Sequence, residues 1–120
     1  MSDEKIFDVD VEVFDERVLA ASRQTPVLVD FWADWSAPCH AISPHLASVI
    51  SDLAGHVRLA KVEVDEGENM KLAGRYKVRG FPTVMLFSAG EEIARFSGAR
   101  PANWIENWID QHLPALPRPA

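Results

Sequence analysis

The sequence predicts an α/β domain of three layers, in which a mixed five-stranded sheet lies between two layers of helices. Apolar runs with the length of buried strands alternate with amphipathic helical patterns, and the last two strand patterns follow each other directly. Strands joined through helices form parallel crossovers, whereas consecutive strands form an antiparallel hairpin. The expected order of elements is therefore β-α-β-α-β-α-β-β-α, in a chain of 120 residues that can bury one core.

The first quarter of the chain predicts two strands and one helix. Residues 6–7 are apolar within a polar segment, which indicates a short edge strand. Apolar side chains then recur at three- and four-residue spacing, which predicts an amphipathic helix that ends near Ser22, with Asp10 as its N-cap. Residues 27–32 form a nearly continuous apolar run, typical of a strand buried on both faces. Asp30 is the exception, a carboxylate in the middle of that run.

The middle of the chain predicts a longer helix, a strand and a short helix. The longer helix is expected to open around residues 36–38, to be kinked by Pro44 and to stop at Gly55. Residues 57–64 predict the next strand, with both faces buried because the apolar alternation changes phase within it. Apolar spacing in residues 70–76 predicts the short third helix.

The last third of the chain predicts a hairpin and a final helix. Residues 83–87 and 93–96 have the composition of strands, and the polar segment between them is typical of a hairpin connection. Pro101 begins a helix with one wide apolar face. We therefore expect a single domain over residues 1–113 and a proline-rich, extended tail over residues 114–120.

Composition argues against several classes of protein. A single cysteine, Cys39, is too few for a disulfide-rich scaffold, a structural zinc finger or an iron–sulfur cluster. The formal net charge of −6 argues against binding to nucleic acid or to anionic membranes. No apolar run approaches the ~20 residues of a membrane span, and the acidic start does not resemble a signal peptide. We expect a cytoplasmic protein without a cofactor.

Cys39 is the first candidate for chemistry. It lies where a strand gives way to a helix, and backbone N–H groups with the helix dipole favour anions at such a junction. Its position on the apolar stripe of that helix favours the alternative of a buried, inert side chain. The residues alone leave both interpretations open.

Asp30 and Lys61 are ionisable residues in neighbouring predicted core strands. Desolvation raises the pKa of a buried carboxyl, which would suit Asp30 to proton transfer near neutral pH; a structural aspartate is the alternative. The Phe81–Pro82 step is a candidate cis peptide bond, although an ordinary trans proline is more common. The histidines lack the spacing of a metal site, and we assign no metal ligand.

Several segments resemble the thioredoxin family. Residues 27–40 match the family's strand and its Trp-Cys-Gly-Pro-Cys-Lys motif, with three departures within the hexapeptide. Residues 60–61, 78–83 and 97–99 match further landmarks of the family in the same order. The resemblance extends from about residue 6 to residue 113 and implies the thioredoxin fold.

This resemblance implies roles for individual residues. Asp30 is similar to the family's buried acid, which transfers protons to and from the second cysteine, and Lys61 lies beside it. Pro82 takes the place of the family's cis-proline. Six residues resemble the rim of the groove that holds a substrate peptide: Trp35, Val64, Gly80, Phe81, Gly98 and Ala99. The implied partners are client or substrate proteins, bound as extended peptides by a monomer.

The three departures lie within the motif itself. Ser36 stands at the position of the nucleophilic cysteine, Ala37 replaces glycine, and His40 replaces the usual lysine or arginine. Cys39 occupies the second, resolving position. Dithiol exchange needs one thiolate to attack a disulfide and a second thiol to resolve the mixed disulfide. The two-cysteine cycle is therefore impossible in this chain.

Three functions remain open. In the first, the Ser-x-x-Cys site is natural and acts by client binding, by monothiol exchange at Cys39, or by both. In the second, Ser36 is an engineered substitution in a protein disulfide oxidoreductase. In the third, the domain is a non-catalytic, chaperone-like module that binds peptides, with Cys39 inert. Whether the protein is an enzyme depends on which of the three holds.

Overall fold

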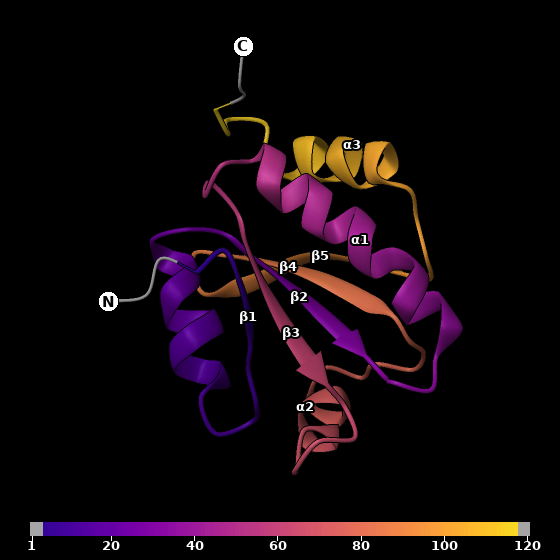
Figure 1. The fold of residues 1–120 in the computed structure, drawn as a ribbon. Coiled ribbons are helices and arrows are strands. Elements are labelled where there is room, and N and C mark those ends of the chain that lie inside the picture. Colours follow the sequence, from indigo (N-terminus) through magenta and orange to yellow (C-terminus); the bar gives the residue numbers. More distant parts are fainter. Residues whose placement is uncertain (1–3, 118–120) are drawn as a thin grey trace.

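A five-stranded mixed sheet with strand order β1-β3-β2-β4-β5 forms the centre of the protein (Figure 1). The computed structural model describes residues 4–117. Strands β1 (Ile6–Asp8) and β2 (Val27–Trp32) each pair in parallel with β3 (Arg58–Glu63). Strand β4 (Thr83–Ser88) pairs antiparallel with β2 and with β5 (Glu91–Ser97). The predicted α/β fold with a mixed five-stranded sheet is confirmed.

Helices cover both faces of this sheet (Figure 1). On one face, α1 (Ala37–Asp52) packs beside α3 (Ala102–His112). The other face is covered by α2 (Met70–Arg75) and by the N-terminal helical segment, a π-helix η1 (Asp15–Ala20) followed by a 3-10 turn η2 (Ala21–Arg23). The three predicted layers are therefore present. No helix among residues 4–117 is long and apolar enough to cross a membrane.

Alternation along β2 divides the core between the two faces. Val27, Val29 and Phe31 are fully buried in the cluster under η1 and α2, whereas Leu28 belongs to the cluster under α1 and α3. Because side chains two residues apart share a face of a strand, Asp30 points to the α1 side, like Leu28. A strand buried on both faces was predicted for this run and is confirmed.

The first helix begins later than its apolar spacing predicts. Asp10 does cap the segment, because its carboxylate accepts the N–H groups of Glu12 and Val13. The N–H of Val11, however, donates to the side-chain oxygen of Asn69, 58 residues away in sequence. Residues 11–13 form turns, and regular helix follows only after them.

The other boundaries shift by one or two residues. Helix α1 contains Pro44 as predicted, but it ends before the expected stop at Gly55, because Ala54 already adopts a positive φ of 51°. Strand β5 begins two residues before Ile93, because Ala89 and Gly90 both have positive φ and make a tight two-residue turn.

The predicted C-terminal tail is described only in part. Residues 114–117 form a turn in which the N–H of Leu116 donates to the carbonyl of Leu113 at 3.2 Å. Leu116 also packs against the cluster under α1 and α3, so this part of the tail is not extended as predicted. Residues 118–120 lie outside the described residues.

Candidate functional site

The turn from β2 into α1 carries Ser36 and Cys39. Ser36 is the N-cap of α1: its backbone is extended, and its hydroxyl oxygen accepts the N–H of Cys39 at 3.3 Å. This bond satisfies one of the N–H groups that every helix leaves free at its start, and Pro38 lacks such a group. Ser36 is 5% exposed and Cys39 is 2% exposed. The Ser36 hydroxyl therefore has a structural partner. The Cys39 thiol is buried, as its position on the apolar stripe of the helix favoured.

His40 does not complete a thiol–imidazole pair. Its Nε2 lies 2.6 Å from the carbonyl oxygen of Asp34, so this nitrogen carries a hydrogen and donates it. The same nitrogen is 3.7 Å from the Asp34 carboxylate, and the ring meets Trp32 edge-to-face. The imidazole is thus turned toward Asp34 and Trp32. Among residues 4–117, no three His, Cys, Asp or Glu side chains are placed to hold a metal ion.

Asp30 and Lys61 are brought side by side by the pairing of β2 with β3. Asp30 is 1% exposed, and neither of its carboxylate oxygens has a hydrogen-bond partner within the part of the chain that the structure describes. Burial raises the pKa of Asp30 to about 7, an effect that the positive charge of Lys61 partly offsets. The ammonium of Lys61 donates to the Ser43 hydroxyl at 3.3 Å and lies 5.2 Å from the centre of the Trp32 ring. Asp30 is therefore a desolvated acid in the core.

Trp35 and Phe81 form an aromatic pair outside this turn. Trp35 is 71% exposed, and its ring meets that of Phe81 edge-to-face with the centroids 6.0 Å apart. The indole N–H donates to the carboxylate of Asp65 at 2.9 Å, which fixes the direction of the ring. The pair presents apolar area in a set orientation, which suits it to contact another molecule.

The segment before β4 and the end of β5 adjoin this pair. The Phe81–Pro82 peptide bond is cis, as the resemblance implied. The Pro82 carbonyl accepts the N–H of Gly98 at 2.9 Å, and the Gly80 carbonyl accepts the Thr83 hydroxyl at 2.7 Å. These contacts link Gly98 to the segment that holds Gly80 and Phe81, and Ala99 follows Gly98 in the chain. Together with Trp35, these residues make up what we call the apolar rim: Trp35, Gly80, Phe81, Gly98 and Ala99.

Val64, the remaining residue predicted for the rim, lies below the surface. It is 1% exposed and belongs to the core cluster with Val62 and Leu72. Its N–H donates to the carbonyl of Trp32 at 2.9 Å. The Val64 side chain is therefore part of the core and not of the exposed rim.

Comparison with known proteins identifies the family to which this fold belongs. The family model for thioredoxin matches residues 5–111. This chain belongs to the thioredoxin family. Thioredoxin C-2 of Corynebacterium nephridii is 42% identical over 102 residues, which is 85% of this chain and 91% of the relative. A thioredoxin of Chlorobaculum thiosulfatiphilum is 35% identical over 109 residues, 91% of this chain and 97% of its own length. Probable thioredoxin-2 of Caenorhabditis elegans is 40% identical over 111 residues, 92% of this chain and 74% of the relative.

As a member of the thioredoxin family, the chain is atypical in its cysteine content. Its one thiol lies in the first turn of α1, and the N-cap position before it holds a serine. The fold, the cis peptide bond and the buried acid are nonetheless present.

Two features of the site could not be located from the sequence. Asp65 orients Trp35 from 30 residues away, and a surface pocket of about 330 Å³ opens between the ends of β1 and β3. Both depend on which strand ends meet in space. A carboxylate after an apolar run was the only hint of Asp65, and such residues are common at strand ends.

Proposed function

We propose that this thioredoxin-family protein binds client polypeptides non-covalently at the apolar rim and does not turn over disulfides. The carrying observation is a contrast between adjacent residues. Trp35 is 71% exposed, whereas Ser36 is 5% exposed and Cys39 is 2% exposed. A client that approaches the rim therefore meets aromatic surface and not a reactive sulfur.

The chemistry of disulfide exchange supports this assignment. In that reaction a thiolate attacks one sulfur of the client disulfide, the other sulfur leaves as a thiolate, and a second thiol then resolves the mixed disulfide. The chain has one cysteine, and a serine hydroxyl cannot form a disulfide. His40, the nearest imidazole in the motif, is directed to the Asp34 carbonyl and is not placed as an activating base for Ser36.

Monothiol exchange at Cys39 is the second candidate for the same site, and burial weighs against it. Attack needs the thiolate to reach a client sulfur directly, and only 2% of Cys39 is accessible. An engineered Ser36 would leave the same geometry, so that alternative is best tested by restoring the second cysteine.

Binding at the rim has a physical basis in its rigidity. Tryptophan and other aromatic residues supply much of the binding energy at protein interfaces. Trp35 is held by Asp65 and packed against Phe81, so little side-chain entropy remains to be lost when a client docks. The rim thus resembles a preorganised anchor.

The test uses insulin B chain with its thiols blocked by iodoacetamide, so that only non-covalent binding is measured. Fluorescence anisotropy of the labelled B chain gives the affinity. We expect Trp35→Ser/Phe81→Ser to weaken binding at least about tenfold, because two aromatic anchors are removed. Ile93→Ser is the matched control: Ile93 is an exposed apolar residue (41%) on β5, outside the rim, and its loss should leave the affinity unchanged.

Two outcomes would contradict the proposal. Unchanged affinity in the Trp35→Ser/Phe81→Ser protein would remove the rim as the binding surface, provided that circular dichroism shows an intact fold. Loss of binding in Cys39→Ala, with an intact fold by circular dichroism, would show that non-covalent binding depends on the turn and not on the rim alone. We expect Cys39→Ala to bind like the parent.

A further inference from the structure

A band of carboxylates lies next to the apolar rim. Because β1, β3 and β2 run parallel, their C-terminal ends meet at one edge of the sheet, where Asp8 ends β1 and Glu63 ends β3. The turns that follow β2 and β3 add further carboxylates at the same edge. We call this set the acidic flank: Asp8, Asp34, Glu63, Asp65 and Glu66.

The members of the flank are close enough to influence one another. Desolvation, followed by the negative charges of Glu66, Asp34, Asp65 and Asp8, raises the pKa of Glu63 above its ordinary value. The N–H of Glu66 also donates to the Glu63 carbonyl in a tight turn. Carboxylates that disfavour the ionisation of a neighbour create a negative potential that attracts cations.

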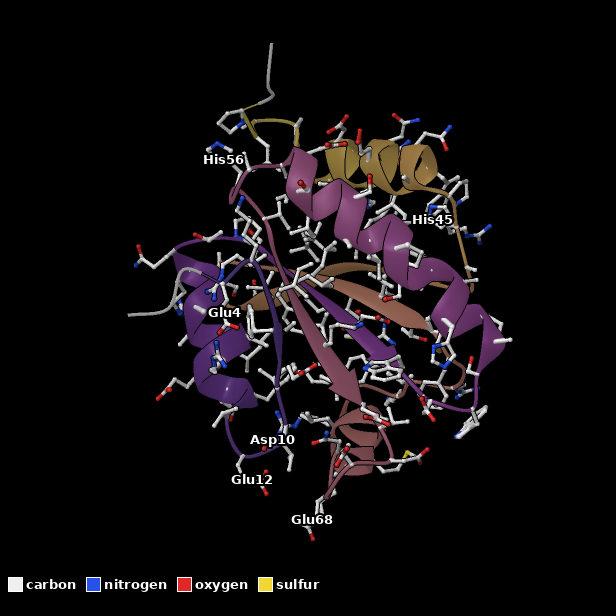
Figure 2. All side chains as sticks on the ribbon, viewed as in Figure 1. Glu4, Asp10, Glu12, His45, His56 and Glu68 are labelled. Atoms are coloured by element: carbon white, nitrogen blue, oxygen red, sulfur yellow. The ribbon has the colours of Figure 1, made fainter. Side chains whose placement is uncertain are left out.

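The flank is continuous with the rim through Asp65, whose carboxylate holds the Trp35 indole. Figure 2 shows further acids, Asp10, Glu12 and Glu68, at the same end of the molecule, near α2, whereas His45 and His56 lie toward the α1 side. The hydrogen bond between Trp35 and Asp65 thus joins the aromatic anchor of the rim to a carboxylate of the flank.

A pocket of about 330 Å³ gives part of this flank a concave shape. Four acidic residues line it, together with Trp32: Asp8, Asp10, Glu63 and Glu66. The cation in its lining, Lys61, donates to Ser43 and lies over the Trp32 ring. Four carboxylates against one engaged ammonium leave the pocket negative, and its volume is in the range of pockets that admit organic groups.

Building on the proposed function, we propose that the acidic flank selects basic clients. The bound segment is an extended polypeptide that sets an apolar side chain against Trp35 and Phe81 and directs lysine or arginine side chains to the flank and its pocket. Charge complementarity is the ground for this occupant. A second copy of the chain is the poorer fit, because each copy carries a formal net charge of −6 and the copies repel.

Three synthetic peptides of equal length test the proposal by isothermal titration calorimetry. Each has the centre Val-Phe-Leu, flanked on both sides by two lysines, two glutamines or two glutamates. In 20 mM salt we expect the lysine peptide to bind about tenfold more tightly than the glutamine peptide, and the glutamate peptide to bind most weakly. In 0.5 M salt the lysine and glutamine peptides should agree within about twofold, because surface charges are then screened.

Matched variants assign the preference to the flank. Glu63→Gln/Glu66→Gln should bring the lysine and glutamine peptides to within about twofold at low salt, with the affinity for the glutamine peptide unchanged. Asp52→Asn/Glu91→Gln removes the same two charges elsewhere. Asp52 ends α1, and Glu91 pairs with Ser88 at the end of β4 opposite to the rim. This control should keep the full preference for lysine.

The outcomes separate the two proposals. Equal affinity for the lysine and glutamine peptides, with both lost in Trp35→Ser/Phe81→Ser, overturns the selection of basic clients and leaves rim binding intact. Failure of all three peptides to bind, or binding that survives loss of both aromatic residues, overturns rim binding itself. A dimer in sedimentation equilibrium that dissociates on adding peptide would assign the surface to a second copy and overturn the flank proposal.

Discussion

The Ser36–Cys39 turn and the apolar rim are adjacent in the fold and opposite in character. In the turn, a hydroxyl is used to cap α1 and the only thiol is closed off. In the rim, one residue earlier in the chain, Trp35 stands 71% exposed and is held in place by Asp65. The difference teaches that binding and chemistry are separable here, because the rim requires aromatic rings in fixed positions and the redox cycle requires two sulfur atoms.

The largest expected effect follows from giving the turn its second sulfur. Ser36→Cys should raise dithiothreitol-driven reduction of insulin at least about 100-fold over the parent, because a thiol at the start of a helix ionises readily and Cys39 is three residues away to resolve the mixed disulfide. Turbidity from the precipitating insulin B chain measures the rate. Such a result would show that the turn lacks only one sulfur atom to be active, beside a rim that already binds clients.

The control for this experiment is Ser36→Cys/Cys39→Ala. It keeps the attacking thiol and lacks the resolving one, so its rate should stay near that of the parent. If Ser36→Cys itself stays at the parent rate, Ala37 and His40 have altered the turn as well. The inactivity of the turn would then be due to several residues and not to the missing sulfur at position 36 alone.

The second effect concerns Asp30, the acid buried in β2. Asp30→Ala should raise the free energy of unfolding on the order of 3 kcal/mol above pH 7, because it removes a charged group that is 1% exposed and has no hydrogen-bond partner within residues 4–117. Urea denaturation at pH 4, 5.5, 7 and 8.5 measures the gain. If the parent is as stable as Asp30→Ala at pH 8.5, or more stable than it, the prediction is wrong.

The pH dependence of that gain has a defined sign. The pKa of Asp30 is about 7 in the folded protein and near its ordinary value of 3.8 in the unfolded chain. Between these values the folded protein holds a proton that the unfolded chain has released, so the stability of the parent falls as pH rises from about 4 to about 7. The gain from Asp30→Ala should therefore widen over that window and be constant above it.

Features that depend on local pattern were accessible from the sequence. The apolar run of β2 predicted a strand buried on both faces, and the stripe on α1 predicted an inward Cys39. The resemblance added the cis bond before Pro82. Each follows from residues close together in the chain or from a motif of consecutive residues, which is why one sequence was enough.

Features that depend on distant contacts were not accessible. The Asn69 side chain accepts the N–H of Val11 across 58 residues, in the turns that precede the first helix. Val64 was expected on the rim and lies in the core. The acidic flank gathers charges from the ends of two strands and from two turns, and only the parallel pairing brings Asp8 near Glu63. Such proximity is set by tertiary structure, which spacing along the chain does not encode.

The smallest expected effect tests whether Ser36 is kept for folding. Ser36→Ala removes the acceptor of the Cys39 N–H and should lower the free energy of unfolding by about 1 kcal/mol, the usual cost of losing an N-cap. Ser48→Ala, at an exposed position within α1, is the control and should be neutral or slightly stabilising. Urea denaturation compares both with the parent. Equal midpoints for Ser36→Ala and the parent would mean that the hydroxyl does not support the helix, and the closed turn would then lack the structural role that distinguishes it from the rim.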